Sequence, residues 1–135
     1  MKRAGSLIVV PLLALGLGAC GSTVSTSSFK GEAQAVAQRI SDLQSDVTAA
    51  SEQKLCNQDF ARAVRARLNT GGGNCQQAVK RQIGSIDGYE VTVEKVAVSG
   101  ATATAIVKST WSGKLGLATL RLVKEGGSWR IASLE

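Results

Sequence analysis

The period of the hydrophobic pattern changes once along this 135-residue chain, shortly before Tyr89. Before that point apolar residues recur every three or four positions, at 29, 33, 36, 40, 43 and 47. That spacing places them on one face of an α-helix. From Tyr89 onward apolar and polar residues alternate, as in a strand with one buried face. Helices followed by strands predict an α+β domain in which the helices pack on one face of an antiparallel sheet.

Three helices are predicted before the change of period. The first spans Phe29 to Ala50, and the second runs from about Asn57 to Leu68. Three consecutive glycines at 71–73 end the second helix, because glycine favours a flexible connection. A short third helix follows, from about Asn74 to Ile83.

Three glycine-containing pairs predict tight turns in the second half of the chain. They are Ser99-Gly100, Ser112-Gly113 and Gly126-Gly127. These turns delimit four strands, at residues 89–98, 101–111, 114–124 and 128–134. The alternation slips by one residue near Glu94-Lys95, which predicts a β-bulge in the first strand. The expected sheet is therefore a four-stranded antiparallel meander.

The N-terminus has the features of a bacterial export signal. Lys2 and Arg3 precede an apolar run at 7–17, and small residues follow it. This run is shorter than the roughly 18–20 residues that a membrane-spanning helix needs. Residues 1–19 are therefore predicted to be a removable signal peptide.

The end of this signal, Leu17-Gly18-Ala19-Cys20, resembles a bacterial lipobox. The resemblance implies that Cys20 carries a diacylglyceryl group and becomes the first residue after cleavage. Two or three acyl chains hold a protein durably on a membrane. An ordinary cleaved signal and an uncleaved anchor remain alternatives. Residues 20–28 are rich in Ser and Thr and are predicted to form a tether between the lipid and the domain.

Two further cysteines, Cys56 and Cys75, lie in the predicted exported domain. Oxidising compartments favour a disulfide between such a pair. The alternatives are free buried thiols or a metal site, but two thiolates without histidine form a poor zinc site. Closing a loop of about 20 residues should contribute roughly 3 kcal/mol to stability.

The composition excludes several classes of chemistry. The chain contains no histidine, which removes histidine-based catalysis and histidine-ligated metals. No catalytic residue set, metal site or cofactor is predicted. The net charge of +6 falls to +4 without Lys2 and Arg3, and export excludes nucleic acid as a partner.

The element order resembles the nuclear transport factor 2-like fold, also called the cystatin-like cone, over residues 29–135. More narrowly, it is similar to small actinobacterial lipoproteins of this fold. The features that match are the lipobox, the tether, the segments LCNQDFARAVRARL and GGGNCQQAV with their cysteines, and the C-terminal GGSWRIASL. The resemblance implies a long first helix lying across a curved sheet and closing a cone around a pocket.

A pocket in this cone is the predicted binding site. Small side chains on the second strand leave volume to be filled. The predicted lining residues are Asp87, Tyr89, Val93, Val107, Trp111, Leu117 and Trp129. The alternative is that the first helix fills the cone with Val36, Ile40, Leu43 and Val47.

The function expected from these features is that of a lipid-anchored envelope protein that binds without catalysis. Its partner would be another envelope protein or a small apolar ligand. The alternative is a small-pocket enzyme or apolar-ligand carrier that uses Asp87 and Tyr89. A homodimer is a further possibility, because the resemblance implies open sheets that pair back to back.

Overall fold

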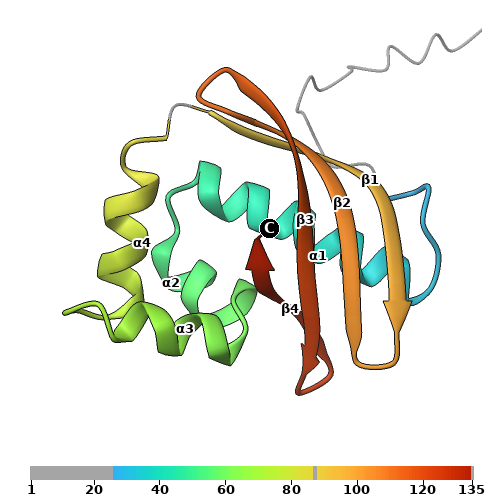
Figure 1. The fold of residues 1–135 in the computed structure, drawn as a ribbon, viewed down its shortest axis with the longest axis horizontal. Coiled ribbons are helices and arrows are strands. Elements are labelled where there is room, and N and C mark those ends of the chain that lie inside the picture. The colour runs from blue at the N-terminus through green and yellow to red at the C-terminus, as the bar shows by residue number, and fades with distance from the viewer. Residues whose placement is uncertain (1–25, 87, 135) are drawn as a thin grey trace, which may run out of the picture.

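The computed structural model describes residues 26–86 and 88–134. The predicted signal peptide, Cys20 and Asp87 lie outside the described residues. The elements follow in the predicted order, helices first and strands afterwards (Figure 1). They are α1 (Glu32–Thr48), α2 (Glu52–Lys54), the π-helical turn η1 (Leu55–Asp59), α3 (Arg62–Asn69), α4 (Cys75–Ile83), β1 (Tyr89–Ser99), β2 (Thr102–Trp111), β3 (Lys114–Glu125) and β4 (Ser128–Leu134).

The four strands form one antiparallel meander in the order β1-β2-β3-β4, as the alternation predicts. The register between β1 and β2 shifts between Val93 and Lys95, which confirms the predicted bulge. Ser112 and Gly113 both have positive φ, 48° and 79°, as a two-residue type I′ hairpin turn requires. The β2–β3 turn lies at the opposite end of the sheet from the other two turns (Figure 1).

Helix α1 packs across one face of the sheet and forms one core with it (Figure 1). From α1, Val36 and Ile40 are completely buried and Leu43 is almost so. The strand residues that meet them include Val91, Val107, Leu120, Leu122 and Ile131. Each fully buried aliphatic side chain of this kind contributes about 1.5–3 kcal/mol relative to an exposed one. This face of the sheet, which we call the inner face, carries the stability of the domain.

The start of α1 is fixed to the β3–β4 hairpin by polar contacts. The carboxylate of Glu32 accepts hydrogen bonds from Lys124 Nζ at 2.9 Å and from Trp129 Nε1 at 2.7 Å. Both hydrogen bonds lower the pKa of Glu32, and the bond from Lys124 has the larger effect. The helix begins at Glu32 rather than at Phe29, because Gly31 has a φ of 60° and turns the chain before it.

The predicted second helix, Asn57 to Leu68, is wrong in its first half. Asn57 lies inside η1, and the chain then becomes extended at Phe60 and Ala61. Phe60 forms a bridge with Ile131 of β4, and the Ala61 N–H donates to the Ile131 carbonyl at 2.8 Å. Hydrogen bonding to the edge of the sheet thus replaces helical bonds at this point, and α3 begins only after it.

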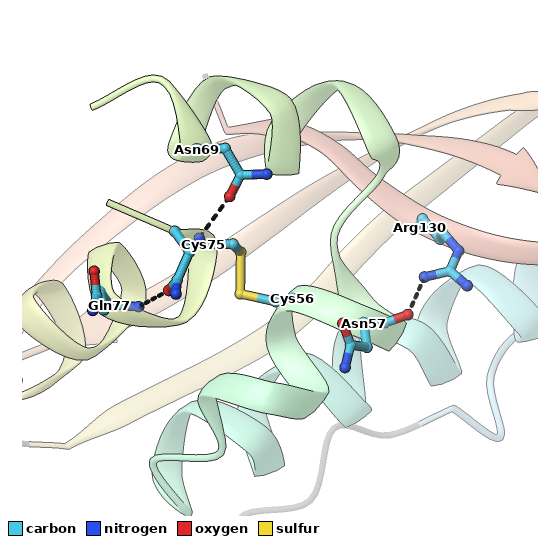
Figure 2. Close-up of a disulfide and its surroundings, with 7 residues drawn as sticks. Cys56, Asn57, Asn69, Cys75, Gln77 and Arg130 are labelled. Carbon is cyan, nitrogen blue, oxygen red and sulfur yellow. Dashed lines mark hydrogen bonds between the residues drawn. A yellow bond between two sulfur atoms is a disulfide. The ribbon is translucent and has the colours of Figure 1, made fainter. Parts of the chain in front are cut away.

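The predicted disulfide between Cys56 and Cys75 is present and joins η1 to α4 (Figure 2). Asn69 and Asn74 order the loop between the two cysteines. The Asn69 side chain accepts from the Cys75 N–H at 2.8 Å, and Asn74 caps α4 by accepting from the Gln77 N–H at 2.9 Å. The disulfide and the bond between Asn69 and Cys75 together hold the two ends of the glycine-rich segment 71–73.

Candidate functional site

The cone interior, where a pocket was predicted, is occupied by side chains of α1. Tyr89, Val93, Val107 and Trp129 all belong to the buried core and are at most 9% exposed. Val36 and Ile40 of α1 pack in the same cluster with no exposed surface. These four predicted residues are therefore brought together, but they lie in a packed core.

Two other predicted lining residues are exposed at the β2–β3 end of the sheet. Trp111 is 49% exposed and Leu117 is 72% exposed. The rings of Trp111 and Tyr89 form a T-shaped pair, with centroids 6.0 Å apart and planes at 84°. Leu117 points away from the core, because the inward positions of β3 are those that pair with Val107 and Ala105, namely Ala118 and Leu120. These two residues line the surface of the sheet.

Tyr89 is poorly suited to act as a base. Burial raises the pKa of its hydroxyl to about 12, so the phenol keeps its proton at neutral pH. An efficient general base has a pKa near the working pH. Its predicted partner Asp87 lies outside the described residues.

The outer face of the sheet, opposite α1, is exposed and partly apolar. Its central residues are Thr104 and Ile106 of β2 and Thr119 and Arg121 of β3, which lie opposite one another in the register. Ile106 is 42% exposed, although isoleucine is among the residue types most often buried. Further toward the β2–β3 turn, Leu115 and Leu117 are still more exposed.

The outer face is hollowed near the β1–β2 turn. The hollow has a volume of about 400 Å³. It is lined by Ala97, Val98, Ser99, Thr102, Ala103, Thr104, Arg121, Leu122 and Val123. A second, smaller hollow of about 140 Å³ lies on the same face, beside Ile106, Leu117, Ala118 and Thr119. Small side chains on β1 and β2 create this concave surface, which is shaped to receive a convex apolar group.

A buried ionic cluster, which the sequence reasoning missed, lies between α1 and η1. Asp59 has no exposed surface and Asp46 is 7% exposed. Arg39 donates from Nη1 to Asp59 Oδ1 at 2.9 Å, and its Nε donates to the Trp129 carbonyl at 2.8 Å. Lys54 Nζ lies 3.7 Å from Asp46 Oδ1.

Burial raises the pKa of Asp59 to about 7, against the opposing effect of the Arg39 hydrogen bond. The neighbouring Asp46 raises this pKa further, because two adjacent carboxyl groups resist being charged together. No substrate reaches a carboxyl without exposed surface, so the cluster holds η1 on α1. No local pattern around Asp59 distinguishes it from a surface acid, since its partners lie in other segments.

Within residues 26–86 and 88–134, no three His, Cys, Asp or Glu side chains are grouped so as to hold a metal ion. In that same part of the chain, no helix combines the length and the apolar character needed to cross a membrane.

The shape of the domain is similar to solved structures, whereas no protein-family model and no curated protein matches the sequence. One similar structure is a nuclear transport factor 2-like protein of unknown function from Shewanella baltica. It has a TM-score of 0.56 and 18% identity, over 76% of this chain and 90% of that one. Another is a nuclear transport factor 2-like protein of unknown function from Silicibacter pomeroyi. It also has a TM-score of 0.56 and 18% identity, over 82% of this chain and 96% of that one.

These likenesses show that the chain has a nuclear transport factor 2-like fold. They confirm the fold class expected from the element order. Folds of this kind carry unrelated functions, so function must be argued from the surface of this chain itself.

Proposed function

We propose that this protein is a lipid-anchored lipoprotein of the bacterial envelope and a non-catalytic binding module. Its partner is another envelope protein that presents an apolar surface. The observation that carries the proposal is the contrast between a filled interior and an exposed apolar outer face. The inner face is closed by α1, whereas Ile106 and the 400 Å³ hollow lie open on the outer face.

The envelope location is supported by the N-terminal sequence. The basic n-region, the apolar run at 7–17 and the Leu17-Gly18-Ala19-Cys20 motif together favour lipidation at Cys20. The Cys56–Cys75 disulfide agrees with an oxidising compartment. Labelling growing cells with palmitate tests this part directly. The wild-type protein should take up label and Cys20→Ala should not, and label on the variant would overturn the anchor.

A protein partner suits the outer face better than a small molecule. Apolar side chains spread over neighbouring strands form a broad and shallow contact surface, and such exposed patches mark protein contacts. Arg121 and Thr104, which lie opposite one another beside Ala97, supply the polar groups that orient a partner. Arginine is enriched in protein interfaces.

Crosslinking on intact cells tests the binding surface. Ile106→Lys places a charge at the centre of the outer face, and Gln34→Lys places the same charge at an exposed position of α1. Crosslinked complexes of the wild-type protein should disappear in Ile106→Lys and persist in Gln34→Lys. A complex of twice the protein's mass would identify a second copy as the partner. Complexes that are unchanged in Ile106→Lys would refute the outer face as the binding surface.

A carrier of a small apolar ligand is the second candidate, and the 400 Å³ hollow favours it. Ligand pockets commonly have volumes of about 300–1,000 Å³. Native mass spectrometry of the protein released gently from membranes decides between the two. A stoichiometric adduct of small-molecule size would support the carrier, and a bare chain would support the protein-binding module.

A further inference from the structure

The end of the β2–β3 hairpin, residues 108–117, exposes an unusual share of large apolar side chains. Every residue from Trp111 to Leu117 is exposed. Leu115 is 75% exposed, Leu117 72% and Trp111 49%. Ser112 and Gly113 form the turn between them. Single exposed leucines are common on proteins, whereas a group that surrounds one turn indicates a contact site.

The apolar side chains of this hairpin end point to both sides of the sheet. Trp111 lies on the same face of β2 as Val107, which faces the core. The ring of Trp111 contacts the ring of Tyr89. Leu115 and Leu117 have the opposite phase and belong to the outer face. A partner lying flat on the outer face would cover the two leucines and leave Trp111 in water. An apolar medium that receives the turn end-on covers all three side chains.

The charges of the hairpin end suit an anionic surface. Within residues 108–117, Lys108 and Lys114 lie among the apolar side chains and no acidic side chain is present, while Glu90 of β1 pairs with Thr110 beside them. Lys108 lies 3.3 Å from Glu94, but both side chains remain well exposed, at 53% and 40%. Water and salt weaken an ion pair of this kind. Lys114 pairs with Trp111 in the register and stands directly at the turn.

Tryptophan, leucine and lysine together are the composition of a segment that enters a membrane interface. Trp prefers the level of the lipid head groups, because its ring is apolar and its N–H is polar. Lysine extends its ammonium group toward anionic head groups while its methylene stem stays near apolar atoms.

We propose that the end of the β2–β3 hairpin inserts shallowly into the head-group region of an anionic lipid bilayer. This inference rests on the proposed lipid anchor, because the anchor supplies most of the membrane affinity. Five residues lie between Cys20 and Thr26, so the six steps from one to the other span at most about 20 Å. An anchor at Cys20 keeps the whole domain at a high effective concentration near the bilayer. A weak insertion is then sufficient to orient the domain on the membrane.

The two tryptophans provide an internal probe for this proposal. Trp111 is half exposed at the hairpin end, whereas Trp129 is buried in the core and bonded to Glu32. The full chain, as isolated from cell membranes, is placed in vesicles of phosphatidylcholine with or without phosphatidylglycerol. Some vesicles carry lipids brominated near the head group, which quench only tryptophans inserted beside them.

The expected result is quenching and a shift of emission to shorter wavelength for Trp111 in the anionic vesicles. The variant Trp111→Phe, which keeps only Trp129, should show neither change. The double variant Leu115→Ser/Leu117→Ser should lose at least two-thirds of the quenching, because both side chains are exposed and contribute little to folding. Gln34→Ser, at an exposed position of α1 outside both proposed surfaces, is the control and should behave as wild type.

Three outcomes would overturn the proposal. One is the absence of quenching in wild-type protein that is bound to anionic vesicles. Another is equal quenching in the double-serine variant. The third is a change of Trp111 emission that depends on protein concentration without any vesicle, since that result assigns the hairpin end to a second copy of the chain. Palmitate labelling at Cys20 reports on the anchor separately, so failure of the anchor and failure of the insertion are distinguishable.

Discussion

The two faces of the sheet are built from alternate residues of the same strands, yet their surroundings are opposite. On the inner face, Val107, Leu120 and Leu122 are at most 1% exposed and pack against α1. On the outer face, Ile106 and Leu117 are 42% and 72% exposed. Residues that point to the inner face therefore stabilise the domain, and the alternate residues, which point to the outer face, are available to bind a partner. Changes on the inner face should unfold the domain, and changes on the outer face should alter contacts.

Removing a core side chain of α1 is the strongest test of this separation. Ile40 is completely buried against the inner face, so Ile40→Ala removes apolar contacts and leaves a cavity. We expect a loss of about 2–5 kcal/mol in the free energy of unfolding. Urea denaturation of the full chain, followed by circular dichroism, measures it. A loss below about 1 kcal/mol would show that α1 is loosely packed on the sheet.

The disulfide should have the next largest effect. The double variant Cys56→Ser/Cys75→Ser frees η1 from α4 and should lower the free energy of unfolding by about 3 kcal/mol. The same denaturation experiment measures this loss. Reduction of the wild-type protein with a thiol reagent is the control, and it should produce a loss of similar size. An unchanged midpoint in both cases would mean that the loop at 71–73 is held by Asn69 and Asn74 alone.

The buried Asp59 should give the domain an unusual dependence on pH. Its folded pKa is about 7, above its ordinary value of 3.8. Between these values the folded state holds a proton that the unfolded state has released. Stability should therefore fall as pH rises from about 4 to about 7, by at most roughly 1.4 kcal/mol per pH unit, and level off above that.

The test of this dependence compares the wild-type protein with Asp59→Asn. The difference between their unfolding free energies should change with pH in this window, because asparagine does not titrate. Asp42→Asn is the matched control, since Asp42 lies 3.7 Å from the same Arg39 but is 42% exposed. A difference that stays constant from pH 4 to 7 would contradict the raised pKa of Asp59.

The parts of the fold that could be predicted from sequence are those with local signals. The glycine turns, the alternation of the strands and the slip at Glu94-Lys95 all lie within a few residues of the features they determine. The break at Phe60 could not be predicted, because it depends on Ile131, which is distant in sequence. The outward position of Leu117 could not be predicted, because the leucines of β3 change phase between Leu117 and Leu120 and only the register with β2 shows which phase faces the core. The cluster of Arg39, Asp46 and Asp59 forms by tertiary packing alone.

The smallest effect on stability should come from a substitution on the outer face. This substitution gives the most direct comparison of the two faces. Ile106→Thr keeps a β-branched side chain that suits a strand and removes apolar surface that is already 42% exposed. We expect a change in the free energy of unfolding within about 0.5 kcal/mol, together with loss of most of the crosslinked complex seen for the wild-type protein in cells.

Val107→Thr, one residue along the same strand, is the matched control, because it places a hydroxyl in the core where Val107 is 1% exposed. It should cost about 1–3 kcal/mol. Equal losses for the two variants would mean that the outer face is part of the folding core, and that a partner or a second copy normally covers it.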